Sequence, residues 1–168
     1  MNSWSTIIEN LKDGSDVSVD PDRWNLDNPE YNKILDMWKR ANFNLDSIKW
    51  TNYYPGVHFP QEVVNKQQDN LNIKHVHRAW ISKIEPGYMA PRHWDVDENE
   101  QEYLTHGLIR RYTIIMEDMP HGHILIIGKD HYYNQPKGTV IKWANYKEWH
   151  SGINAGMTPN YLFHILGS

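Results

Sequence analysis

Hydrophobic and polar positions change their period along the chain. In the segment NPEYNKILDMWKRANF, residues 28–43, apolar residues recur at helical spacing. Asn28 followed by Pro29 is typical of a helix start, because the side chain caps the first turn and the proline fits it. A second, shorter helix is predicted over residues 59–71, and the aromatic segment WTNYYPGV, residues 50–57, is predicted as a loop.

Beyond about Lys74 the pattern becomes alternating and rich in β-branched residues, which is typical of strands. Segments carrying Pro, Gly, Asn or Asp separate these stretches, and no long helix fits between them, which argues against a parallel βαβ fold. Short, regularly spaced strands instead indicate a β-sandwich or jelly-roll barrel. We therefore predict a mainly β, single-domain chain, in which residues 1–72 form a helical and irregular lead-in and residues 73–168 form the barrel. The predicted strands lie within residues 75–84, 107–117, 121–129, 138–144 and 160–167.

Composition narrows the classes of partner and ligand. The 168-residue chain has a formal net charge of -4 and no dense Lys/Arg block, which argues against nucleic acid as its main partner. No apolar run approaches the roughly 18 residues of a membrane span, and the first residues lack a leader pattern, so we expect a cytoplasmic protein with no membrane partner. The absence of cysteine excludes thiolate ligands, which leaves nitrogen and oxygen ligands for iron, manganese, zinc or copper.

The segment EPGYMAPRHWDVDENE contains a candidate metal-binding pair, His93 and Asp95. In a strand, residues i and i+2 point the same way, so both side chains can reach one ion. His150, which we expect directly after a strand, offers a third ligand. Two histidines and one carboxylate on one face of a metal are typical of iron sites for oxygen chemistry. The alternative is that these are ordinary polar residues on an exposed loop.

A second histidine pair, His121 and His123, has the same i, i+2 spacing. No carboxylate lies close by in sequence on the same face, and Gly122 between them indicates a turn or bulge. We therefore favour the first pair as the metal site.

The segments ISKIEPGYMAPRHWD, RRYTIIMED, KGTVIKWANYKEWHSG and NYLFHILG together resemble the 2-oxoglutarate- and Fe(II)-dependent oxygenases. The likeness is closest to the aspartyl/asparaginyl β-hydroxylase group and spans about half of the chain, Trp80 to Gly167. It implies a double-stranded β-helix, a jelly-roll or cupin-like barrel, with His93, Asp95 and His150 as iron ligands. The animal β-hydroxylases have no acidic residue at the position of Asp95. With Asp95 present, this chain has the commoner triad of two histidines and one carboxylate.

The resemblance also implies residues that hold 2-oxoglutarate. It places a basic residue on the strand that carries the adjacent Arg110 and Arg111, which must point to opposite faces. We predict that Arg110 faces the interior, because Tyr112 and Ile114 share its face, and that Arg110 and Tyr112 contact the co-substrate. A guanidinium suits a carboxylate because it can bind both oxygens.

The remaining predicted co-substrate residues are Ser82, Asn160 and His164. Ser82 lies on the strand before the Pro-Gly turn and matches a serine that contacts 2-oxoglutarate in the β-hydroxylase group. Asn160 occupies the position, ten residues after His150, where that group has an arginine for the co-substrate carboxylate. Because an amide cannot supply the same charge-assisted pair, three explanations stay open: Arg110 acts alone, His164 assists it, or the co-substrate differs.

These residues support a leading hypothesis and two alternatives. The leading one is an oxygenase that uses Fe(II), 2-oxoglutarate and O2 to hydroxylate an amino-acid side chain, free or in a peptide or protein. A cupin-type metalloenzyme, such as a dioxygenase or isomerase, would use the same ligands without 2-oxoglutarate. A non-catalytic jelly-roll binding module would carry the histidine and aspartate only by chance.

Overall fold

The computed structural model describes residues 3–11, 15–18, 28–95, 105 and 107–168. These residues form three α-helices, a short 3-10 helix at Leu45–Ser47 and ten strands. The helices are α1 (Trp4–Glu9), α2 (Pro29–Arg40) and α3 (Gln61–Leu71). The strands are β1 (Ser15–Ser18), β2 (Lys49–Tyr53), β3 (Val76–Ile84), β4 (Met89–His93), β5 (Arg110–Ile115), β6 (His123–Ile127), β7 (Asp130–Tyr132), β8 (Val140–Lys142), β9 (His150–Asn154) and β10 (Asn160–Gly167).

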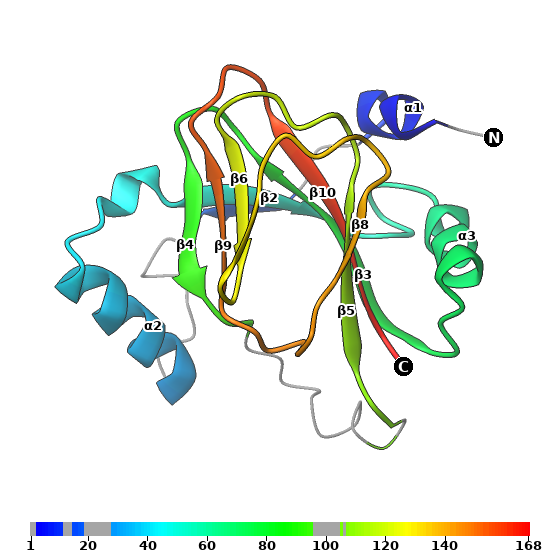
Figure 1. The fold of residues 1–168 in the computed structure, drawn as a ribbon, viewed down its shortest axis with the longest axis horizontal. Helices are drawn as coiled ribbons and strands as arrows, with labels where there is room; N and C mark the ends of the chain where they lie inside the picture. The colour runs from blue at the N-terminus through cyan, green and yellow to red at the C-terminus, as the bar shows by residue number, and fades with distance from the viewer. Residues whose placement is uncertain (1–2, 12–14, 19–27, 96–104, 106) are drawn as a thin grey trace.

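The strands form two antiparallel sheets that face each other (Figure 1). One sheet has the order β1-β2-β3-β10-β5-β8, and the other has the order β4-β9-β6-β7. From β3 onward the chain passes repeatedly from one sheet to the other, and consecutive strands share a sheet only at the β6–β7 hairpin. This winding is the double-stranded β-helix, so the predicted fold class is confirmed.

The larger sheet separates two apolar cores because side chains alternate between its faces. Leu162 of β10 and Ile115 of β5 belong to the core between the sheets. Phe163 and Ile114, their neighbours in sequence, belong to a second core on the outer face. Helices α1 and α3 cover that outer face (Figure 1). Both faces of the larger sheet are therefore buried over its central strands.

Helix α2 and its cap agree with the prediction from sequence. The Asn28 side chain accepts a hydrogen bond of 3.0 Å from the backbone N–H of Glu30, and Pro29 is the first helical residue. The helix lies beside β4 (Figure 1), where the Trp38 indole N–H donates to the Arg92 carbonyl at 2.9 Å. This bond fixes the backbone immediately before His93.

The predicted loop at residues 50–57 was wrong over its first half. Residues 49–53 form β2, which pairs with β3, and β1 pairs with β2. The lead-in therefore contributes two strands to the larger sheet. The segment KWTNY lacks a clear alternation of apolar and polar residues, and its pairing partner supplies the order that its own pattern does not.

None of the described helices is both long enough and apolar enough to cross a membrane.

Candidate metal centre

The two histidines of the predicted triad lie directly opposite each other on paired strands. β4 ends at His93, β9 begins at His150, and these two residues are partners in the antiparallel register. Their ring centroids are 4.2 Å apart, and both side chains are buried. His150 therefore starts a strand, whereas the sequence analysis placed it after one. The predicted proximity of the two imidazoles depends on this pairing.

Asp95 joins the histidines from the segment that follows β4. One of its oxygens, Oδ1, lies 3.7 Å from His93 Nε2 and 3.5 Å from His150 Nε2. Because β4 ends at His93, strand alternation is not what brings Asp95 to the site, and that part of the prediction was wrong. One ligand atom from each of the three residues lies within 4.8 Å of the others. No second group of this kind occurs among the described residues.

Backbone carbonyls fix the tautomer of both imidazoles. His93 Nδ1 lies 2.6 Å from the Pro91 carbonyl, and His150 Nδ1 lies 3.0 Å from the Glu148 carbonyl. A carbonyl only accepts, so each ring carries a proton on Nδ1, and in its neutral form Nε2 keeps the lone pair. Both lone pairs belong to the nitrogens closest to Asp95. Metal-binding histidines typically have this arrangement of the second nitrogen.

Burial and neighbouring charges keep His93 and Asp95 in the protonation states that bind a cation. Burial, with a further contribution from His150, lowers the pKa of His93 to about 3. Burial opposes ionisation of Asp95, but the Arg111 guanidinium and the neighbouring imidazoles hold its pKa well below the usual value. At neutral pH His93 is therefore a neutral imidazole and Asp95 a carboxylate, which are the protonation states that a divalent metal requires.

Arg111, not Arg110, faces the interior. Arg111 is 3% exposed and its Nη1 donates to Asp95 Oδ2, which leaves Oδ1 for the two histidines. Arg110 is exposed, and Tyr112 packs against the outer core. The predicted interior position of Arg110 and Tyr112 was therefore wrong by one residue in register, since Ile114, which shares their face, belongs to the outer core.

Two tryptophans hold the Arg111 guanidinium in place. Its central carbon lies 3.9 Å from the ring centroid of Trp143 and 4.9 Å from that of Trp80. Cation–π contacts of this kind strengthen when they are shielded from water. Arg111 Nε is buried and has no hydrogen-bond partner among the described residues. A buried donor without a partner is costly, so this edge of the guanidinium is suited to an acceptor from a ligand.

A chain of hydrogen bonds next to Arg111 contains two of the predicted residues. The Trp143 indole N–H donates to Thr113 Oγ1 at 2.9 Å, and Thr113 Oγ1 lies 3.1 Å from His164 Nδ1. His164 Nε2 in turn lies 2.9 Å from Ser82 Oγ. Burial and the Arg111 charge hold the pKa of His164 well below its usual value. His164 is therefore neutral and can donate to Ser82 through Nε2.

Ser82 and His164 thus lie on the inner side of the larger sheet, near the metal triad, and their contact with 2-oxoglutarate stays a prediction. Thr113 was missed in the sequence analysis, although its position two residues after Arg111 would have identified it once Arg111 was assigned to the interior.

Asn160 lies apart from this group. It precedes His164 by four residues on β10, which corresponds to about 13 Å along a strand, and it lines a separate cavity of about 310 Å³ with Glu117, Asp118 and His123. Asn160 Nδ2 is buried without a partner among the described residues. His123 Nε2 donates to the Thr158 carbonyl at 2.8 Å.

The chain can be compared with protein-family models, curated sequences and solved structures. No family model matches the chain, and no curated protein sequence matches it. A viral collagen prolyl hydroxylase from Paramecium Bursaria Chlorella virus-1, solved with 2OG, is 14% identical, with 80% of this chain and 86% of that chain covered at a TM-score of 0.48. A predicted oxalate decarboxylase from Thermotoga maritima is 12% identical over 71% and 80% of the two chains, with a TM-score of 0.44. A putative sugar phosphate isomerase from Acidithiobacillus ferrooxidans is 15% identical over 73% and 61%, with a TM-score of 0.42. The activities that these neighbours are named for differ from one another.

Proposed function

We propose that this protein is a non-haem Fe(II)- and 2-oxoglutarate-dependent oxygenase that hydroxylates an amino-acid side chain, free or in a peptide or protein. The observation that carries the proposal is the convergence of His93 Nε2, His150 Nε2 and Asp95 Oδ1, with both imidazoles in the ligand tautomer. Two imidazole nitrogens and one carboxylate oxygen are the donor set of the facial triad, which leaves other positions open for co-substrate and O2. The sequence resemblance to the aspartyl/asparaginyl β-hydroxylase group supports the same assignment.

In this proposal the metal, when bound, supplies the activation of O2 and the oxidation of the C–H bond. The residues of the chain bind the metal, orient its ligands and shield them from water. Arg111 holds Asp95 through Oδ2, so that the carboxylate presents one oxygen to the metal. The indole of Trp50 stacks on the His93 ring with the centroids 5.8 Å apart, and the rings of Trp143 and His150 form a T-shaped pair with the centroids 4.7 Å apart, so aromatic rings shield both histidines from water.

The co-substrate carboxylate is assigned to the unpartnered edge of Arg111. Nε has no partner, and Nη2 lies 3.5 Å from His164 Nδ1. A carboxylate at this edge would accept two charge-assisted hydrogen bonds, with the Ser82 hydroxyl close by on the neighbouring strand. In this proposal Arg111 on β5 supplies the charge that Asn160 on β10 lacks.

The test is anaerobic titration with Fe(II) and then 2-oxoglutarate. The proposal expects the visible metal-to-ligand charge-transfer band, and, with O2 and a substrate, formation of succinate. His93→Ala and His150→Ala are expected to abolish both signals with an unchanged circular dichroism spectrum. Lys129→Gln, a change on the exposed β6–β7 turn, is the matched control. Normal turnover in either histidine variant would refute the proposal.

A second candidate, a cupin-type metalloenzyme that does not use 2-oxoglutarate, has one observation in its favour. Asn160 stands where the β-hydroxylase group has its carboxylate-binding arginine, and Arg111 already has an internal partner in Asp95. This candidate predicts metal uptake through the same three ligands without the charge-transfer band.

A further inference from the structure

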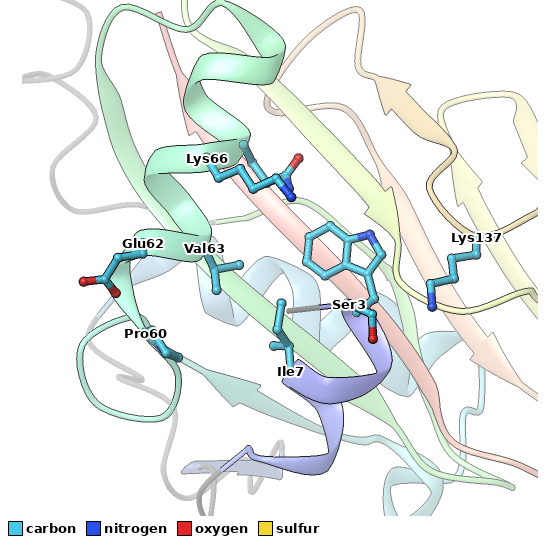
Figure 2. A pocket seen from close by; sticks show the side chains of 9 residues that line it. Ser3, Ile7, Pro60, Glu62, Val63, Lys66 and Lys137 are labelled. Carbon is cyan, nitrogen blue, oxygen red and sulfur yellow. The ribbon is translucent and has the colours of Figure 1, made fainter. Parts of the chain in front are cut away.

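A cavity on the outer face of the larger sheet lies on the far side of that sheet from the candidate metal centre. Residues from α1, α3 and the segment before β8 enclose about 380 Å³, a volume within the range of small-molecule sites. Figure 2 shows Ile7 and Val63 facing each other across the cavity from α1 and α3. The side chains that contact the metal triad point to the opposite face of β10 and β5, so this cavity is a separate feature.

The apolar part of the cavity lining packs against the outer core. Ile7 is buried, and Trp4 and Val63 are partly buried against the same core. The Trp4 ring packs on Phe163 of β10 with the centroids 5.6 Å apart. The indole therefore keeps one surface for the core while the residue also lines the cavity, which suits an apolar ligand body.

Two lysines from different elements supply the charge at this cavity. Lys66 comes from α3 and Lys137 from the segment before β8. The Lys137 backbone N–H donates to Asp118 Oδ1 at 2.8 Å, and its Nζ donates to Ser5 Oγ at 3.0 Å, so this ammonium group is held beside α1. Glu62 also lines the cavity, but Figure 2 shows its carboxylate directed away from Ile7 and Lys137.

We propose that this cavity binds a small amphipathic carboxylate. The apolar body would lie against Trp4, Ile7 and Val63, and the carboxylate would lie between Lys66 and Lys137. The charges favour an anion, since two lysines line the cavity while the carboxylate of Glu62 at its rim points away. The lysine stems extend the apolar wall while their charged ends stay in water. The proposal concerns a site that is independent of the proposed oxygenase activity.

The experiment measures binding of octanoate and of octylammonium, which share an alkyl chain and differ in charge, by titration calorimetry on the Fe(II)-loaded full chain without O2. Octanoate is expected to bind the more tightly. Each lysine-to-glutamine change should weaken octanoate binding about two- to fivefold, and Lys66→Gln with Lys137→Gln about tenfold, because the ion pairs are exposed. The matched control, Lys129→Gln, should leave the affinity unchanged.

Two further variants locate the binding event. Val63→Glu places a carboxylate inside the cavity on a partly exposed helix position, so octanoate binding is expected to be lost with the helical circular dichroism signal unchanged. His93→Ala removes a candidate metal ligand and is expected to leave octanoate affinity unchanged. The proposal is overturned by equal affinity for octylammonium, by unaltered affinity in the double lysine variant, or by loss of binding in His93→Ala. Absence of octanoate binding at millimolar concentration also overturns it.

Discussion

The two faces of the larger sheet are built from residues that are neighbours in sequence. The outer face is apolar, whereas the inner face carries buried, hydrogen-bonded polar groups beside the metal triad. On β10, Phe163 is buried in an apolar cluster under α1 and α3, while His164 lies in a hydrogen-bonded group beside the metal triad. On β5, Ile114 belongs to the outer face and Thr113 to the inner one. The outer face thus contributes stability through burial, and the inner face uses buried polar groups to orient one another.

The inner face carries a free-energy cost that the outer face does not. Buried polar groups destabilise a protein unless each has a partner, and His164 and Thr113 meet this condition through one chain of bonds. Arg111 Nε does not meet it. The comparison therefore predicts that substitutions on the outer face have the largest effects on stability. Substitutions of polar residues on the inner face should change stability less and should also change ligand affinity or the pH dependence of folding.

The largest expected effect is on stability, from Phe163→Ala. The ring is fully buried and contacts Trp4 and Phe59 at centroid distances of 5.6 and 6.1 Å. Removing it should lower the free energy of unfolding by about 3–5 kcal/mol, measured by urea denaturation. The metal affinity of the folded fraction should not change. A loss of metal affinity comparable with that of His150→Ala would show that the two faces are not separable.

The next effect is a loss of stability in acid for the metal-free protein. Burial lowers the pKa of His93 to about 3 and that of His164 well below its usual value, whereas in the unfolded chain both take up a proton near pH 6.5. Between these values the unfolded state binds more protons, so the free energy of unfolding falls as pH decreases below about 6.5. The expected slope is up to about 1.4 kcal/mol per pH unit for each histidine.

Asp95 acts in the same direction at lower pH. Its pKa is held below the usual carboxyl value, so its contribution is present above about pH 4 and is lost as pH falls through its folded-state pKa. Replacing His164 with Gln should reduce the slope between pH 6.5 and 5. An identical slope in this variant would mean that His164 is not held neutral by its surroundings.

The paired arginines of β5 show why the fold was more predictable than the site. The strand pattern of residues 107–117 indicated β5 correctly, but it did not fix which face is interior. Ile114 and Ile115 are both buried, one on each face, so alternation gives no preference. A shift of one residue exchanges the two faces. For this reason Arg110 was predicted to face the interior, whereas the structure places Arg111 there.

Other differences between the prediction from sequence and the structure also arise from contacts between strands that are distant in sequence. His93 and His150 were predicted from composition and order, but their pairing depends on β9, whose segment HSGIN has little strand character of its own. β2 is similar, because β3 provides its register. Helix α2 was predicted well because its cap and apolar face are local features. Local signals were readable from the sequence, whereas the contacts across strands were not.

The arginine pair also allows a direct test of the corrected register. Arg111→Gln removes the group that orients Asp95, so the affinity for Fe(II) or for 2-oxoglutarate should fall by about 10- to 100-fold, as is typical when a residue that supports metal ligands is lost. Arg110→Gln, one residue away and exposed, is the matched control and should change either affinity by less than about twofold. Equal effects in the two variants would contradict the placement of Arg111.

The smallest effect concerns the hydroxyl of Thr113, which joins Trp143 to His164. Thr113→Val keeps the shape of the side chain but leaves the indole N–H and His164 Nδ1 without this partner, so the free energy of unfolding should fall by about 1–2 kcal/mol in urea denaturation. Thr113→Ser, which retains the hydroxyl, should recover most of the loss. If the serine variant is as unstable as the valine variant, the methyl group and not the hydrogen bond stabilises this position. The inner face would then depend on packing at Thr113 in the same way as the outer face does at Phe163.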